Sequence, residues 1–373
     1  MDERNVHDRT GTLIRSSYLP AQLRWLEQSD ARTFKQVKRW MSIGEYLHLQ
    51  LFGETAVSYS VASWTGLLDR RALHWDEAML AASHITSQHL SPLVDRDQPM
   101  QGLRAPWAER WPALAHIPWY PAVGDGAASS IGCGCTEQRR MALALGTSGA
   151  IRVTTTRAIE DIPPGLWVYR VDRERSLLGG ALSEGGSIWA WMNDTLQLSD
   201  DPDEIERELA AMEPDAHGLT VLPFLLGERS PGWHSDARAA VAGLSLHTKP
   251  VEILRAGLES IGYRFRELVE LVSREAHDVQ EVVASGNPIL RSPAWSQIIA
   301  DVLQRPIIIT AENEATSRGV AVLTLASLGL INSLDQLPAA VGQTFHARSE
   351  HRAAYSDGAE RHINLYRLLV GER

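Results

Sequence analysis

The stretch EVVASGNPILRSPAWSQIIADVLQRPIIIT, Glu281–Thr310, decides the fold class of this 373-residue chain. Its start, Glu281–Gly286, is typical of a strand, and its end, Pro306–Thr310, is typical of a second strand. Between them, apolar side chains recur at helical intervals, at Trp295, Ile298, Ile299, Val302 and Leu303. Strands that alternate with helices predict an α/β domain, which binds its ligands at the carboxyl ends of the strands.

Other segments have a helical period. After Thr248, which can cap a helix, apolar residues are spaced alternately four and three apart, at Leu254, Leu258, Ile261, Phe265, Leu268 and Val272. The segment up to about Leu90 is also mostly helical in pattern, and a small-residue helix is predicted from about Thr316 to near Gly329. These helices supply packing surface and carry no chemistry by themselves.

Composition excludes several classes of function. The 44% hydrophobic and 22% charged residues are those of an ordinary globular protein, and the length suggests two domains. A net charge of −10 without any block of Lys and Arg argues against a nucleic-acid partner. No apolar run approaches the roughly 20 residues that a membrane helix needs, and the charged start does not suggest a secretory signal. We therefore expect a cytoplasmic protein with a small-molecule partner and no membrane contact.

The chain contains only two cysteines, Cys133 and Cys135. One intervening residue is too few for ordinary disulfide geometry, and two thiols are too few for structural zinc, so we interpret both as small buried residues. Thirteen scattered histidines include no HExxH-type pair. We therefore expect no metal site held by the protein itself.

Four glycine-rich turns carry the candidate chemistry. In the first, Gly124-Asp125-Gly126, the glycines let a ligand approach the backbone, and the small residues that follow open a helix with free N–H groups. Asp125 can act there as a general base on an attacking hydroxyl, as phosphoryl transfer requires. An ordinary Asp-Gly turn is the alternative interpretation.

The other three turns can surround a nucleotide. LGTSG (Leu145–Gly149) lies between two predicted strands, where its amides and hydroxyls can hold phosphate oxygens, although a plain hairpin is the alternative. GGALSEGG (Gly179–Gly186) precedes a predicted helix with Trp189 and Trp191, and suits either a nucleotide pocket wall or a plain loop beside core tryptophans. Ser285–Pro288 follows a strand, where an α/β sheet binds its ligand, although an ordinary strand-to-helix turn is the alternative.

The order of these turns resembles that of the FGGY carbohydrate kinases, and among them a gluconokinase-like branch. The resembling stretches cover nearly the whole chain, and their combination is specific where each alone is weak. They are Thr10–Leu26, Ser58–Asp69, Gly124–Gly132, Leu145–Val153, Gly179–Gly186, Leu222–Trp233, Ala284–Leu303 and Ala315–Gly329.

The resemblance implies an α/β fold of two actin-like, ribonuclease-H-like ATPase domains. We place them at residues 1–136 and 137–373, with the boundary near Thr136 inferred from a change in sequence texture. The resemblance further implies that Asp125 is the catalytic base and that Gly124 and Asp125 contact the substrate. ATP, which brings Mg²⁺ with it, would be bound by Gly146, Thr147, Gly186, Gly286 and Asn287.

The loop Leu222–Trp233 contains Glu228 and Arg229 and is expected to be buried, as is typical of the family. For Arg229, an ion-paired structural role is favoured over contact with substrate. Smaller departures from the family pattern are Gln22, Asn287 and Val320, where lysine, glycine and alanine are usual.

The start of the chain also departs from the family pattern. Family members open with an Asp-x-Gly-Thr turn that forms the first phosphate-binding site, whereas the first resembling stretch here begins at Thr10. We therefore expect a first domain truncated at its N-terminus, with an exposed sheet edge and apolar face. A start site set too late, a split gene whose product supplies a complementing N-terminal fragment, and a degenerate remnant all stay open.

Three functions are compatible with these features. The first is ATP-dependent phosphorylation of a sugar or sugar-acid hydroxyl, with gluconate favoured because GTSGAIR and GGALSEGG are most similar to the gluconokinase branch. The second is the same reaction on xylulose or another ketose or polyol. The third is a non-catalytic nucleotide-binding remnant, which the missing phosphate turn supports. A homodimer is a further open alternative for the assembly.

Overall fold

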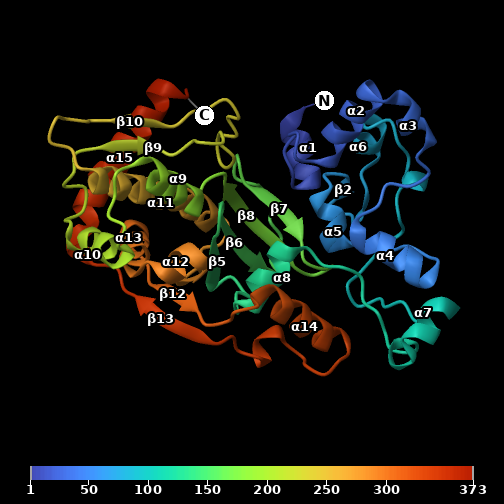
Figure 1. Cartoon of the computed structure of the whole chain (residues 1–373). Helices are drawn as coiled ribbons and strands as arrows, with labels where there is room; N and C mark the ends of the chain where they lie inside the picture. The colour runs from blue at the N-terminus through green and yellow to red at the C-terminus, as the bar shows by residue number, and fades with distance from the viewer. Residues whose placement is uncertain (1, 372–373) are drawn as a thin grey trace.

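A computed structural model describes residues 2–371 of the chain. A seven-stranded sheet organises its second half, in the order β13-β12-β11-β5-β6-β8-β7 (Figure 1). The strands are β5 (Arg140–Leu145), β6 (Gly149–Thr155), β7 (Trp167–Arg170), β8 (Ser176–Leu182), β11 (Glu281–Ser285), β12 (Ile307–Thr310) and β13 (Val341–Phe345). Strand β11 is parallel to β5 and to β12, and the other neighbours are antiparallel. The predicted alternation of strands and helices is confirmed for the β11–β12 unit.

Helices cover both faces of this sheet (Figure 1). One face packs on α11 and α13 in a large apolar core, and the other packs on α8 and α14 in a smaller one. All six apolar positions predicted for α11 are fully buried. The helices of this half are α8 (Asp125–Gly132), α9 (Gly186–Thr195), α10 (Pro202–Ala211), α11 (Pro250–Ser273), α12 (Asn287–Arg291), α13 (Pro293–Leu303), α14 (Ala315–Ser327) and α15 (Arg352–Leu369), with a small antiparallel pair of strands, β9 (Thr220–Leu222) and β10 (Ala240–Ala242).

The start of α11 differs slightly from the prediction. The helix begins at Pro250 with Lys249 as its N-cap, and the Glu252 carboxylate accepts a hydrogen bond from the Lys249 amide at 2.7 Å. Thr248 instead accepts a hydrogen bond from the Ser245 amide at 2.9 Å. Because proline is preorganised for the first helical position, the cap lies one residue later than the sequence suggested.

The backbones of α8 and α14 touch through two glycines. A β-carbon on Gly132 would lie 2.6 Å from the carbonyl carbon of Ala315, and one on Gly319 would lie 2.6 Å from that of Ala128. Neither distance leaves room for a side chain. The small residues of both predicted helices therefore serve helix-to-helix contact, which fixes the position of α8 and of Asp125 at its start.

The first half of the chain is mostly helical, as predicted. Its helices are α1 (Glu3–Thr10), α2 (Leu19–Ser29), α3 (Ala31–Gln36), α4 (Ile43–Phe52), α5 (Tyr59–Trp64), α6 (Glu77–Ala82) and α7 (Ala105–Arg110). They enclose a separate apolar cluster formed by Val6, Leu23, Leu67, Met79, Leu80, Ile85 and Leu90. Within residues 2–371, no helix is both long and apolar enough to cross a membrane.

The exposed sheet expected in the first half is not found among the residues that the structure describes. Its strands are only two residues long and form two pairs, β1 (Val57–Ser58) with β4 (Leu93–Val94), and β2 (Leu68–Asp69) with β3 (His74–Trp75). The physical reason is that the helices themselves bury the apolar cluster, so little apolar sheet surface is left uncovered. Exposed apolar side chains instead lie on the helices α2 and α4, at Trp25, Ile43 and Leu47.

The two halves meet along β7, the edge strand of the large sheet. The Val168 amide donates a hydrogen bond to the Gly11 carbonyl at 2.9 Å, and the His7 imidazole hydrogen-bonds the Leu166 carbonyl at 2.8 Å. Gly11 has a φ of +75°, and a β-carbon there would lie 3.0 Å from the carbonyl carbon of Val168. The end of α1 therefore covers an edge that would otherwise be open.

Candidate active site

Three of the four predicted turns lie together at one edge of the large sheet. Gly146 follows β5, Gly286 follows β11, and Gly186 begins α9 just after β8. The Gly186 amide donates to the Gly146 carbonyl at 2.7 Å, and the Ser187 amide donates to the Thr147 carbonyl at 3.2 Å. Because β5, β8 and β11 point the same way, their carboxyl ends bring these turns into contact.

Two of these glycines lie where no side chain fits. Gly286 has a φ of +110°, and a β-carbon there would lie 2.6 Å from the Leu145 carbonyl carbon. A β-carbon on Gly186 would lie 2.5 Å from Cγ of Pro288. Gly146 is different, because the nearest atom to its β-carbon position is the Ser148 carbonyl oxygen at 4.0 Å. Gly146, Thr147 and Ser148 are all exposed, so this turn presents an open backbone surface.

A cavity of about 390 Å³ lies beside these turns, between α9, α10 and α12. Its walls include Gly186, Trp189, Asn287 and Pro288, and they are more apolar than polar. Trp189 stacks on Trp295 at a ring distance of 6.1 Å, which fixes its indole. Three of the predicted nucleotide residues, Gly186, Gly286 and Asn287, therefore lie at or beside one cavity whose size and apolar walls suit a planar base.

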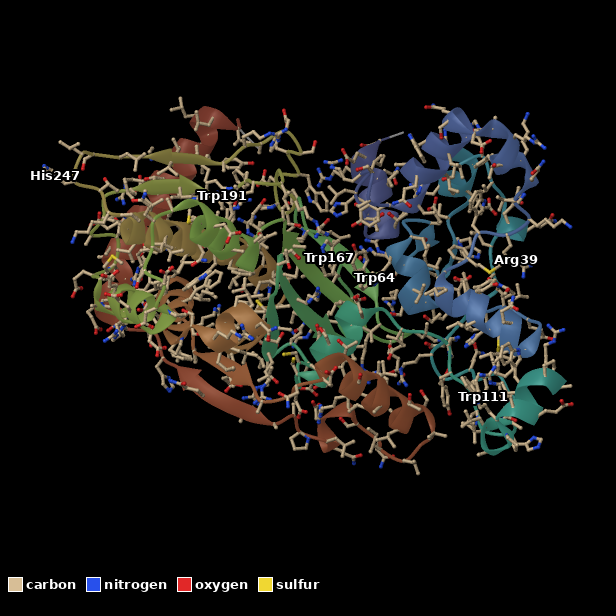
Figure 2. The ribbon with its side chains drawn as sticks, in the orientation of Figure 1. Arg39, Trp64, Trp111, Trp167, Trp191 and His247 are labelled. Atoms are coloured by element: carbon tan, nitrogen blue, oxygen red, sulfur yellow. The ribbon has the colours of Figure 1, made fainter. Side chains whose placement is uncertain are left out.

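The structure changes the interpretation of GGALSEGG in two respects. Gly179 and Gly180 lie within β8, so only Gly185 and Gly186 form the turn. Trp191 is 45% exposed, as Figure 2 shows at the surface of α9, and it is not a core residue. The part of the alternative that placed both tryptophans in the core is therefore wrong, and the choice between a nucleotide pocket wall and a plain loop stays a prediction.

Asp125 is the first residue of α8 and lies at the junction of the two halves. Its carboxylate is exposed and accepts a hydrogen bond from the Gly126 amide at 2.6 Å. The preceding amide, of Gly124, donates to the hydroxyl of Ser60 on α5 at 3.1 Å. Within residues 2–371, no Lys, Arg or His side chain forms an ion pair with Asp125. The carboxylate is thus fixed by its backbone and still able to accept a proton.

Arg152 lies beside Asp125, and sequence analysis did not single it out. It projects from β6 toward α8, where a β-carbon on Gly126 would lie 3.0 Å from its Nε and 3.3 Å from its Cζ. Burial lowers the pKa of the Arg152 guanidinium, and the Asp125 carboxylate acts in the opposite direction. The available signal was a lone charged residue inside the apolar strand GAIRVTT.

Aromatic side chains from both halves surround this point. The Tyr18 and Tyr169 hydroxyls are 2.7 Å apart, and Trp64 and Trp167 lie against the Tyr169 ring at 5.1 and 4.3 Å. Figure 2 shows Trp64 and Trp167 together at the junction. The Trp64 indole N–H is buried and has no acceptor within residues 2–371. Aromatic walls with a spare donor suit a polyhydroxylated ligand better than an apolar one.

The loop Leu222–Trp233 corrects the expectation for Arg229. Arg264 of α11, rather than Arg229, forms the buried ion pair with Glu228, and Tyr366 donates to the same carboxylate at 2.6 Å. Arg229 is exposed and forms no ion pair within the described residues. The ion-paired structural role expected for Arg229 is therefore wrong, because a helix distant in sequence supplies the partner.

Asp215, His217 and Glu259 form a cluster whose oxygen and nitrogen atoms could in principle hold a metal ion. Both His217 ring nitrogens are already used, one by Glu259 at 3.1 Å and the other by the Leu219 amide at 3.0 Å. Arg255 also pairs with Glu259 at 2.7 Å. The cluster is therefore a buried ion-pair network.

Comparison with known proteins identifies relatives along the whole chain. The chain is 30% identical over 386 residues to the gluconokinase of Bacillus licheniformis, an alignment that covers 100% of this chain and 75% of that protein. The solved structures of a xylulose kinase and a gluconate kinase from Lactobacillus acidophilus superimpose with TM-scores of 0.92 and 0.91, each at 24% identity. They cover 99% and 98% of this chain, and 76% and 75% of the solved chains. These superpositions show the two-domain, actin-like ATPase fold.

Family models match both halves. The N-terminal domain of the FGGY family of carbohydrate kinases matches residues 1–132, and its C-terminal domain matches residues 141–328. The expected truncation of the first domain is not supported, because the N-terminal model matches from the first residue. The division near Thr136 stays a prediction. With matches to both domains and relatives at this level of identity, the chain belongs to the FGGY family of carbohydrate kinases, phosphotransferases that act on an alcohol group of a sugar.

Proposed function

We propose that this protein transfers the γ-phosphoryl group of ATP to a hydroxyl of a sugar or sugar acid, with gluconate as the favoured acceptor and Asp125 as the general base. The observation that carries this proposal is the state of Asp125. Its carboxylate is exposed, held by the Gly126 amide at 2.6 Å, and not neutralised by an ion pair in the described residues. A base must combine a fixed position with a free lone pair, and Asp125 has both.

In the proposed step, the acceptor hydroxyl oxygen forms a bond to the γ-phosphorus while the bond from that phosphorus to the β–γ bridging oxygen breaks. The hydroxyl proton goes to the Asp125 carboxylate, and ADP leaves with the bridging oxygen. The protein contributes mainly position and charge to such a reaction. Asp125 begins α8, and the contact of α8 with α14 through Gly132 and Gly319 fixes its location.

The nucleotide is proposed to lie along the three glycine turns, bound by Gly146, Thr147, Gly186, Gly286 and Asn287. The open backbone at Gly146 suits phosphate oxygens, and the 390 Å³ cavity beside Gly186 and Asn287 suits the base. Mg²⁺ is expected to arrive on the nucleotide, where it neutralises phosphate charge.

Gluconate is favoured over xylulose for two reasons. The Bacillus licheniformis relative that matches over the full length of this chain is a gluconokinase. In addition, the cation Arg152 lies against Gly126, the residue that follows Asp125, and a cation there suits an acidic acceptor better than a neutral one. Xylulose is the alternative, since the structure with a TM-score of 0.92 is a xylulose kinase.

The test is ADP formation by the purified protein with Mg²⁺, ATP and gluconate. We expect gluconate-dependent turnover, and a loss of at least ~100-fold in kcat for Asp125→Asn, because the amide accepts no proton. Asp200→Asn is the matched control, since Asp200 is exposed and lies on the loop before α10. An unchanged kcat in Asp125→Asn would remove the base assignment. Absence of turnover by the folded wild-type protein with any acceptor would favour the non-catalytic nucleotide-binding alternative.

A further inference from the structure

We propose that Arg152 and Arg229 together form a subsite for the carboxylate of the acceptor, and so select sugar acids over neutral sugars. This inference rests on the proposed kinase function and deepens it by naming the acceptor class and the residues that recognise it. Its basis is the surroundings of the Arg152 side chain.

Arg152 carries a half-buried charge without a partner. A guanidinium has five N–H donors, yet no atom in residues 2–371 accepts a hydrogen bond from Arg152, and no carboxylate lies within ion-pairing distance. Other buried or half-buried arginines of the described residues have partners: Arg264 pairs with Glu228, Arg175 pairs with Asp172, and Arg170 and Arg305 donate to backbone carbonyls. Because burial of an unpaired charge is costly, an anionic ligand is the simplest partner for Arg152.

The sheet register sets the direction of this side chain. Arg152 is paired with Gly179 of β8, and Gly179 is paired with Trp167 of β7, so the three residues form one row across the sheet. Directly paired residues project from the same face. The Trp167 ring covers Gly179, since a β-carbon there would lie 2.8 Å from its Cη2. The guanidinium therefore shares its face with this tryptophan and lies toward α8, against Gly126.

The guanidinium lies next to the reacting centre. Its Nε is 3.0 Å from the β-carbon position of Gly126, the residue that follows Asp125. A side chain at Gly126 would push the guanidinium away, so glycine is needed for this approach. An anion bound by Arg152 would consequently lie within one small molecule's length of the base, as the carboxylate of an acceptor must.

Arg229 adds a second positive charge near Arg152. It is exposed on the loop Leu222–Trp233, and the next residue, Ser230, attaches this loop to β8 by donating its amide to the Ala181 carbonyl at 2.9 Å. The charge of Arg229 acts on Arg152 and on the phenols of Tyr18 and Tyr169. Two like charges that share the same neighbours repel each other, and the repulsion is relieved by an anion between them. Arginine also matches the two oxygens of a carboxylate with two parallel N–H groups.

A phosphate of the nucleotide is the competing occupant. Arg152 lies three residues along β6 from Gly149, the residue that closes the open turn, which places it about 10 Å away along the strand. Its neighbours are Gly126, Asp125 and Tyr169 rather than the Gly146 turn. This position favours the carboxylate of the acceptor over a nucleotide phosphate as the anion that Arg152 binds.

The experiment compares gluconate with glucitol, which has the same carbon chain and a CH₂OH group in place of the carboxylate. Binding of each is measured by calorimetry, and kcat/KM is measured for gluconate, for xylulose and for ATP. In Arg152→Gln we expect gluconate affinity to fall about 10- to 100-fold, the range of one charge-assisted contact. Glucitol binding, the KM for ATP and turnover of xylulose should each change less than about threefold.

Arg157→Gln is the matched control, because Arg157 follows the same strand and pairs with Asp278 at the surface. Arg229→Gln should give a smaller loss of gluconate affinity, since its side chain is solvated. A thermal melt tests folding, and removal of an unpaired charge from Arg152 should not lower the Tm.

Each outcome separates the two proposals. An equal loss for gluconate and glucitol, or a raised KM for ATP, would overturn the carboxylate subsite and leave the kinase function intact. If the wild-type protein phosphorylates no acceptor, the proposed function fails, and calorimetry still decides on the subsite. A preference for gluconate over glucitol that disappears in Arg152→Gln would support the carboxylate subsite, whether or not the protein turns over an acceptor.

Discussion

The backbone amide of Gly186 donates a 2.7 Å hydrogen bond to the carbonyl of Gly146, and this bond joins the turn after β5 to the first residue of α9. The turn after β11 closes on the same point, because the β-carbon position of Gly286 is 3.3 Å from the Gly146 amide. Three strands thus end in a single backbone unit. The unit has no side chains over Gly146, which gives that glycine a different role from the other two.

Gly146→Ala and Gly286→Ala should therefore separate binding from stability. The β-carbon at Gly146 has open space, so Gly146→Ala should keep the wild-type Tm and raise the KM for ATP about tenfold by covering the open backbone surface proposed to hold the phosphates. At Gly286 the φ of +110° and the Leu145 carbonyl exclude a side chain, and Gly286→Ala should lose about 2 kcal/mol or more of unfolding free energy. Denaturant unfolding and steady-state kinetics measure both. A lowered Tm in Gly146→Ala with unchanged KM would contradict this assignment.

The three turns at this edge of the large sheet were largely predictable from the sequence, because glycine is needed where backbones lie in close contact. The turns at Gly146 and Gly286 were identified from glycines that follow predicted strands, and the turn at Gly186 from glycines that precede a predicted helix. The structure brings the three turns together. The apolar spacing of α11 likewise predicted its buried face from Leu254 to Val272. The local sequence pattern was sufficient to predict features that depend on a single element, such as a turn at the end of a strand or the buried face of one helix.

Long-range side-chain partners were not predictable in the same way. Glu228 had an arginine beside it in sequence, Arg229, but its partner is Arg264 on α11. Arg152 resembled an ordinary polar position in a half-buried strand, and its importance depends on Gly126 from another element. The small strands of the first half also carry too few residues for a period to be detected.

Gly319→Ala should weaken both the fold and catalysis. Its new methyl group would lie 2.6 Å from the Ala128 carbonyl carbon, so α8 must move away from α14. We expect a loss of about 2 kcal/mol in stability from overpacking, and a fall in kcat as Asp125 is displaced. Val320→Ala is the control on the same helix, since Val320 is 44% exposed. Wild-type stability in Gly319→Ala would show that the helices do not touch here.

His362 should make the protein sensitive to acid. Burial, followed by the positive charge of Arg264, lowers the pKa of His362 to about 3, and its Nδ1 hydrogen-bonds the Val221 carbonyl at 2.9 Å. The unfolded chain takes up this proton near pH 6.5 and the folded chain does not, so stability is lost as the pH falls from about 6.5 toward 3. In His362→Gln the loss of stability caused by this proton should disappear. The unfolding free energy of the variant should therefore fall by about 2 kcal/mol less than that of the wild type between pH 6.5 and 4.5.

Chemical denaturation across this pH range measures the effect. His247→Gln is the control, because His247 lies on an exposed loop, as Figure 2 shows. Parallel curves for wild type and His362→Gln would contradict the buried neutral imidazole.

Glu184 should make the protein less stable as the pH rises, which is opposite to the effect of His362. Its carboxyl group is buried beside the Gly185–Gly186 turn and accepts a hydrogen bond from the Leu226 amide at 2.7 Å. Burial raises the pKa of Glu184 to about 7, and the backbone hydrogen bond of Leu226 acts against this rise. The folded state therefore holds a proton that the unfolded state releases near pH 4.5, and stability is lost as the pH rises from about 4.5 to 7.

Glu184→Gln keeps an acceptor for the Leu226 amide and removes the charge. Its unfolding free energy should exceed that of the wild type at pH 8, by up to about 3 kcal/mol, and approach the wild-type value near pH 4.5. Glu174→Gln, at an exposed site, should follow the wild-type curve. Glu184 joins the Gly185–Gly186 turn, where the nucleotide is proposed to bind, to the loop of Arg229. The KM for ATP should therefore also depend less on pH in Glu184→Gln. A variant less stable than the wild type at pH 8 would show that the folded protein holds Glu184 as a stabilised carboxylate.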